Sequence, residues 1–129
     1  MRGYAAMTAP EVLEFARTKT LDVTDIYAPT QFFIAAHTDL DEEEIEYALT
    51  VVAAEDALEL AAADASTACV LAFEIPTALI SSHNDMSVSL NAPLTWESVE
   101  CLFEVHGDSE SLTWYAPQEI ESALSTAAK

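Results

Sequence analysis

The longest regular pattern of apolar and polar residues runs from Asp39 to Ala65 and predicts one amphipathic helix. Its apolar residues recur at alternating intervals of four and three, which places them on one stripe of a helix. This first stripe consists of Tyr47, Val51, Ala54, Leu58, Ala61 and Ala65. A second stripe, interrupted by Asp56, consists of Ile45, Leu49, Val52, Leu60 and Ala63. Two apolar stripes predict neighbours on both flanks, and the alanines leave space for a sheet or a second helix to approach closely.

Acidic residues mark the start of this helix and the ridge between its stripes. Thr38 or Asp39 is suited to cap the first turn, because a short side-chain oxygen accepts a hydrogen bond from a free backbone N–H. The acids at 41–44 place negative charge at the positive end of the helix dipole. The ridge is expected to face water, since unpaired carboxylates are rarely buried. It consists of Glu44, Ala48, Glu55, Glu59 and Ala62.

Strand patterns occupy much of the remaining chain. The residues from Ala68 to Ile75 form an almost continuously apolar run that ends at Pro76, as expected of a strand covered on both faces. The stretch from Met86 to Asn91 alternates apolar and polar residues, which is typical of a strand with one face in water. Further strands are expected at 1–7, 31–36 and 101–105.

Shorter helices are expected on either side of these strands. Thr8 and Glu11 form a capping-box pattern that predicts a helix directly after the first strand. A helical turn is expected at 112–115, and Pro117 is suited to start a terminal helix. The segments without a clear period, which are expected to connect the elements, are 18–29 and 77–85.

This order of elements predicts an α+β fold. We expect a single domain over residues 1–129, with a mixed β-sheet of about five strands, one long central helix and shorter flanking helices. A chain of 129 residues can bury a proper core without disulfides or metals. Cys69 and Cys101 lie in apolar runs and are expected to be free core thiols, although neighbouring strands would also allow a disulfide.

The charge balance is very acidic. The sequence has 23 Asp and Glu against four Lys and Arg, for a formal net charge of −19. Such a surface repels phosphates and anionic lipids, which disfavours direct binding to nucleic acid and to membranes. Three explanations of the charge remain open. They are solubility alone, adaptation to high salt, and a basic protein partner, which includes a nucleic-acid-binding protein blocked by carboxylates that imitate phosphates.

Each of the three histidines is followed two positions later by an aspartate. The pairs are His37 with Asp39, His83 with Asp85, and His106 with Asp108. Three convergent His-x-Asp loops could ligate a divalent metal or orient an imidazole as a general base. Helix caps and turns explain the same aspartates without a site. Glycine occurs only at Gly3 and Gly107, which leaves no phosphate-cradling loop or dinucleotide fingerprint, and no cofactor is expected.

Short segments over most of the chain carry a family resemblance. They are Met1, Arg2 and Tyr4, then Glu46-Tyr47-Ala48, Ala57-Leu58 with Leu60, Val70-Leu71-Ala72, and Ile75-Pro76. In these segments the chain resembles a family of small uncharacterised actinobacterial proteins, which share a domain of unknown function. The resemblance implies a shared fold and no activity. The family tends to carry arginines on the long helix where this chain has Glu55 and Glu59, so it does not imply a shared charged surface.

The function expected from these patterns is a non-enzymatic interaction module. Its acidic helix ridge, with Glu44, Glu55 and Glu59, would bind a basic protein partner. The alternative is a metal-binding protein or a hydrolase that uses the His-x-Asp loops. A cytoplasmic location is expected, because the start of the chain lacks the apolar core of a signal peptide and no apolar run approaches transmembrane length.

Overall fold

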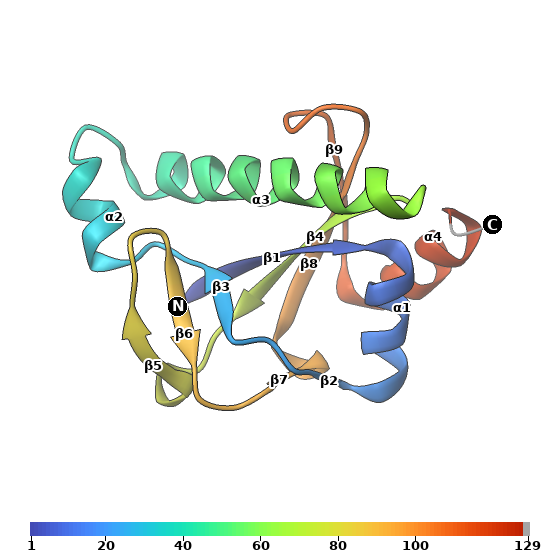
Figure 1. Cartoon of the computed structure of the whole chain (residues 1–129), viewed down its shortest axis with the longest axis horizontal. Coiled ribbons are helices and arrows are strands. Elements are labelled where there is room, and N and C mark those ends of the chain that lie inside the picture. The colour runs from blue at the N-terminus through green and yellow to red at the C-terminus, as the bar shows by residue number, and fades with distance from the viewer. Residues whose placement is uncertain (128–129) are drawn as a thin grey trace.

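A seven-stranded sheet forms the centre of the computed structural model, which describes residues 1–127 (Figure 1). Its strands are β1 (Arg2–Thr8), β3 (Asp25–Tyr27), β4 (Ala68–Glu74), β5 (Ile80–His83), β6 (Ser87–Leu90), β8 (Val99–Val105) and β9 (Leu112–Tyr115). They lie in the order β5-β6-β3-β1-β4-β8-β9, and each pairing between them is antiparallel. A separate small ribbon pairs β2 (Thr20–Leu21) with β7 (Leu94–Thr95). The combination of helices with one main sheet is confirmed, but the sheet is antiparallel rather than mixed and exceeds five strands.

Helices cover both faces of this sheet. They are α1 (Ala9–Thr18), α2 (Gln31–Ala36), α3 (Glu42–Asp64) and α4 (Ile120–Ala127), with 3-10 turns at Thr77–Leu79, Trp96–Ser98 and Pro117–Glu119. α3 lies along one face, and α1 and α4 pack together on the other (Figure 1). In the part of the chain that the structure describes, no helix combines the length and the apolar character needed to cross a membrane.

β4 separates the two cores and contributes to both. Cys69, Leu71 and Phe73 pack in the core beneath α1 and α4, whereas Val70 and Ala72 pack in the core beneath α3. The prediction of a strand covered on both faces is therefore confirmed. Both cysteines are buried free thiols, and they lie in different cores although their strands are neighbours.

α3 begins later than the sequence pattern predicts. Asp41 is the N-cap: its Oδ1 accepts a hydrogen bond from Glu44 N at 2.8 Å, and Glu44 Oε1 accepts one from Asp41 N at 3.1 Å. The expected caps, Thr38 and Asp39, lie instead in the turn before the helix. The reciprocal pair of hydrogen bonds explains why the helix starts at Glu42, because it satisfies two backbone groups at once.

The buried face of α3 lies between the two predicted stripes. Its buried residues are Ile45, Leu49, Thr50, Ala53, Ala54, Ala57 and Ala61. The side chains of Tyr47 and Leu60 are 51% and 44% exposed, and those of Val51 and Leu58 are half-buried. The prediction that both stripes are packed therefore holds only in part, because Ile45, Leu49, Ala54 and Ala61 are buried but Tyr47 and Leu60 are not. The sheet contacts the small side chains around Ala53 and Ala57, where the helix backbone can approach most closely, and the bulkier residues flank this contact.

Two short segments have the opposite structure to the predicted one. The segment 31–36 is helix α2 rather than a strand, because Thr30 Oγ1 caps it by accepting a hydrogen bond from Phe33 N at 3.1 Å. The segment 112–115 is strand β9 rather than a helical turn, because the turn at Gly107, which has a positive φ of 85°, brings it back along β8. The terminal helix after Pro117 is confirmed.

Candidate functional site

The first two His-x-Asp pairs lie at opposite ends of α2. His37 follows the helix, where its Nδ1 is 2.9 Å from Phe33 O and its ring stacks on that of Phe33 with centroids 4.2 Å apart. His83 lies at the start of α2, with Nδ1 accepting a hydrogen bond from Gln31 N at 3.4 Å. The backbone carbonyl of Asp85 accepts one from Thr30 Oγ1 at 2.8 Å. These residues therefore support the local fold of α2.

The third pair lies in the turn between β8 and β9. His106 Nε2 is 2.7 Å from Thr113 Oγ1, and Asp108 accepts hydrogen bonds from Glu110 N and Ser111 Oγ, each at 2.9 Å. The hydrogen bond from the Glu110 backbone, followed by that from Ser111, lowers the pKa of Asp108. This aspartate shapes the turn.

The predicted metal site is not assembled. Within residues 1–127, no three side chains of His, Cys, Asp or Glu are placed together so that they could hold a metal ion. The six residues of the hypothesis are His37, Asp39, His83, Asp85, His106 and Asp108. His37 and His83 lie at the two ends of α2, whereas His106 lies in the turn between β8 and β9, so the three loops do not converge on one site.

The three glutamates predicted to contact a partner have different surroundings. All three are exposed on α3. The side chain of Glu44 accepts the hydrogen bond from Asp41 N in the capping box at the start of the helix. Glu55 and Glu59 lie one turn apart in the second half, and Glu59 also lines the mouth of a pocket.

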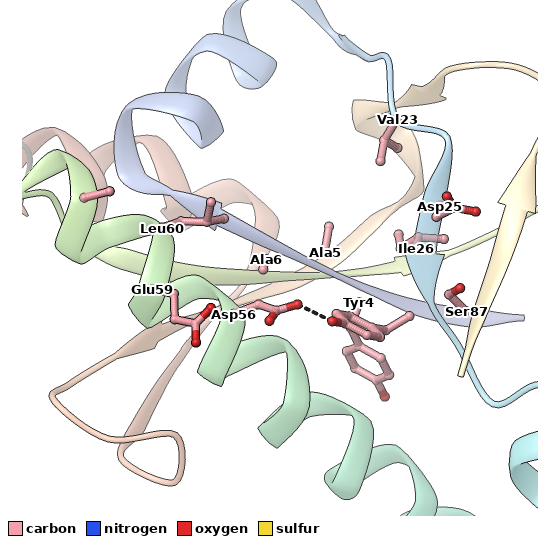
Figure 2. A pocket seen from close by; sticks show the side chains of 12 residues that line it. Tyr4, Ala5, Ala6, Val23, Asp25, Ile26, Asp56, Glu59, Leu60 and Ser87 are labelled. Carbon is pink, nitrogen blue, oxygen red and sulfur yellow. Dashed lines mark hydrogen bonds between the residues drawn. The ribbon is translucent and has the colours of Figure 1, made fainter. Parts of the chain in front are cut away.

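This pocket has a volume of about 530 Å³ and lies between α3, β1 and β3 (Figure 2). It exists because β1 and β3 diverge: among the described residues they pair only at Tyr4 opposite Tyr27. Gly3 allows this close crossing, since a Cβ there would lie 3.2 Å from Tyr27 O and would collide with the Ile75 side chain. Beyond the crossing the walls are mainly apolar. They include Ala5, Ala6, Val23, Ile26, Leu60 and Ala63.

Three carboxylates line the same pocket (Figure 2). Asp56 and Glu59 come from α3, and Asp25 comes from β3. Asp56 accepts a hydrogen bond from the Tyr27 hydroxyl, and Asp25 accepts one from Ser89 Oγ at 2.8 Å. No ion pair in the described region, residues 1–127, involves any of the three carboxylates. The pocket therefore combines apolar walls with carboxylates that are not paired with a base in the described part of the chain.

Tyr27 connects β3 to α3 across this pocket through its hydrogen bond to Asp56. Burial, followed by the hydrogen bond and the negative charges of Asp56 and Glu59, raises the pKa of Tyr27 to about 12. The phenol is therefore protonated at neutral pH and acts as a donor to Asp56. It is not poised to act as a base.

Replacing Tyr27 by Phe is expected to make alkaline unfolding less steep. The ordinary pKa is 10.0 and the folded value about 12, so the stabilisation by Tyr27 is fully present below pH 10 and is lost as the pH rises to about 12. Denaturant unfolding across this pH range measures the slope. Cys69, whose pKa burial also raises to about 12, contributes in the same direction in both proteins. An identical slope in the wild type and in Tyr27→Phe would contradict the role of the hydrogen bond.

Sequence reasoning found Glu59 but not Asp25, Asp56 or Tyr27 as parts of one site. The available signal was Asp56, the acid that interrupts an apolar stripe of the long helix. An acid at such a position faces either a partner side chain or a polar opening in the packing. The partner, Tyr27, lies 29 residues away in a segment without a clear pattern, so it could not be identified.

All residues that line the pocket lie in the part of the chain that matches a known protein family. No curated protein and no solved structure matches the chain. A family model matches residues 1–110, which include β1, β3 and α3 and end before β9. Because this match covers most of the sequence, the chain belongs to DUF6912, a family of unknown function.

Proposed function

We propose that this protein is a non-catalytic acidic module that binds a basic protein partner through lysine or arginine side chains in the pocket between α3 and β3. The observation that carries the proposal is the presence at an apolar opening of three carboxylates that form no ion pair within residues 1–127, namely Asp25, Asp56 and Glu59. Lysine and arginine combine a long apolar stem with a terminal cation. The walls at Ala6 and Leu60 would contact the stem, while the carboxylates bind the cation.

The helix that forms one wall favours a cation for two further reasons. Glu55 and Glu59 are exposed carboxylates four residues apart, and like charges at this spacing repel each other. The last turn of α3 contains no basic residue, although the C-terminal end of a helix dipole is negative. A bound cation would relieve both. The net charge of −19 would in addition steer a basic partner toward the protein, most strongly at low salt.

The proposal can be tested with a lysine-rich peptide and two variants of equal net charge. The first variant neutralises the pocket by Asp25→Asn, Asp56→Asn and Glu59→Gln. Asparagine at position 56 retains an oxygen that can accept the Tyr27 hydrogen bond, so the fold should be preserved. The second variant neutralises three exposed acids elsewhere, by Asp39→Asn, Glu97→Gln and Glu121→Gln.

Titration calorimetry is expected to show a loss of affinity of about tenfold for the pocket variant, because each exposed charge pair contributes about 0.5 kcal/mol. The control variant should lose much less. Equal losses in both variants would mean that the peptide responds only to net charge, and the pocket would then have no specific role. Thermal unfolding of each variant checks that the fold is intact.

A further inference from the structure

β9 is an edge strand with backbone groups that have no partner in the described chain. It is the last strand of the sheet and pairs with β8 along four residue pairs, from Leu102 opposite Tyr115 to Val105 opposite Leu112. His106 N donates to Ser111 O at 2.8 Å, which fixes the alternation of the ladder. Thr113 and Tyr115 therefore direct their N–H and C=O groups toward β8. Leu112 and Trp114 direct theirs away from the sheet.

Within the described residues 1–127, β9 is short but contains no lysine, proline or bulge that would prevent strand pairing at this edge. Native edge strands are commonly protected by lysine, proline, a bulge or a covering segment. β9 has the sequence Leu-Thr-Trp-Tyr, and its register with β8 is regular. The opposite edge, β5, is protected in the usual way, because its register shifts between Ile80 and Ser82. β9 is thus the edge on which a further strand can form.

The surroundings of β9 indicate which strand would fit. Trp114 is 57% exposed and lies opposite Phe103, on the side of the sheet that α3 covers. On the same side, Glu110 accepts a hydrogen bond from the Tyr47 hydroxyl at 3.1 Å and lines a groove beside Glu43. Arginine or lysine suits both kinds of group on this side, because a cation binds the face of an aromatic ring and also binds carboxylates.

We infer that β9 binds an extended basic segment of a partner protein as an additional, eighth strand of the sheet. The backbone of the segment pairs with the free groups of Leu112 and Trp114, and its basic side chains on the α3 side contact Trp114 and Glu110. A second copy of the chain is a poor occupant, because each copy carries a net charge of −19. β4 and β8 lie between this edge and the strands of the pocket, so the inference does not depend on the pocket.

Backbone-methylated peptides test this pairing directly. The probe is a blocked peptide of alternating arginine and valine, about ten residues long. Two derivatives carry N-methyl groups either on the arginines or on the valines. In a strand, alternate residues direct their N–H groups to opposite edges, so only one derivative blocks the hydrogen bonds to β9. We expect that derivative to bind about tenfold more weakly than the unmodified peptide, and the other derivative to bind nearly unchanged.

Equal binding of both derivatives would overturn the inference, because it would show attraction by charge alone. Failure of the unmodified peptide to bind would also overturn it. So would NMR amide shifts of Leu112 and Trp114 that change with protein concentration and not with added peptide, because they would show that β9 pairs with a second copy of the chain. In the pocket variant, the amide signals of Leu112 and Trp114 should respond to the peptide as they do in the wild type, although binding of its arginines in the pocket is lost. Its behaviour separates a failure of this inference from a failure of the proposed function.

Two substitutions of Trp114 test the same backbone pairing by changing the protein and not the peptide. Trp114→Pro removes a backbone N–H that points away from β8, so it should spare the β8–β9 ladder. We expect it to lose peptide binding by at least about tenfold. Trp114→Val keeps the N–H and loses only the ring, and a two- to fivefold loss, roughly the value of one exposed cation–π contact, is expected. Equal losses in the two variants would assign the binding to the indole and overturn backbone pairing.

Discussion

Replacement of Phe73 by alanine is expected to lower the free energy of unfolding by about 4 kcal/mol. Phe73 is fully buried at the end of β4, and its ring packs against that of Phe15 with centroids 6.0 Å apart. Phe15 in turn contacts Trp96 edge to face, with centroids 5.1 Å apart. Removal of the Phe73 ring therefore leaves a cavity beneath α1 that its aromatic neighbours cannot readily fill.

Urea unfolding of Phe73→Ala measures this effect, and Phe32→Ala serves as the matched control. The Phe32 side chain is 50% exposed on α2, so its truncation should cost much less. A loss of about 4 kcal/mol is a large part of the stability of a small domain. Partial unfolding of Phe73→Ala in buffer without urea would therefore also agree with the prediction. Similar costs at the two positions would contradict the assignment of Phe73 to the core.

Enlarging Ala57 to leucine is expected to cost about 3 kcal/mol, the second-largest effect. Ala57 is fully buried at the centre of the face by which α3 contacts the sheet. A leucine there would have to push the helix away from β1 and β4, both of which α3 contacts closely.

Ala62→Leu is the control for this enlargement, since Ala62 is exposed on the same helix and leucine is a good helix former. The free energy of unfolding from urea titration should be nearly unchanged for Ala62→Leu and clearly lower for Ala57→Leu. A neutral Ala57→Leu would mean that the contact between α3 and the sheet is looser than its alanine face indicates.

In α3, the periodicity of the sequence determines the length of the helix but not the face that contacts the sheet. The alternating apolar positions correctly predicted a long helix, and its acidic ridge is exposed at Glu55 and Glu59. The buried face differs from the predicted one because spacing groups residues into stripes but does not determine which side of the helix contacts the sheet. In this helix the sheet contacts alanines, while the tyrosine at position 47 remains 51% exposed. Small residues contribute little hydrophobicity but allow the closest approach.

Short segments were harder to predict than long ones for a physical reason. In α2, six residues fit a strand or a helix equally well, and the hydrogen bond accepted by the buried Thr30 decides between them. β9 depends on its pairing with β8, which no local pattern reveals. The capping box at Thr8 was identifiable because its partner, Glu11, is local: Thr8 N donates to Glu11 Oε1 at 2.9 Å.

The candidate site illustrates the same limit at longer range. The His-x-Asp repeat was visible in the sequence, but its residues serve separate turns and caps. The pocket, in contrast, joins Asp25 of β3 to Asp56 of α3, and only the sheet topology brings them together. Glu59 can be predicted from the helix pattern alone, because it lies on the acidic ridge between the two apolar stripes, which is expected to face water.

The single pairing between β1 and β3 has a consequence for how the molecule opens. β3, β6 and β5 are joined to one another by ladders of several residues, but to β1 only where Tyr4 lies opposite Tyr27. β1, β4 and β8, in contrast, are joined along nearly their whole length. We therefore expect the outer strands to open as one cooperative unit at a lower free energy than β1, β4 and β8, so that backbone amides of the pocket wall exchange faster than those of the central strands.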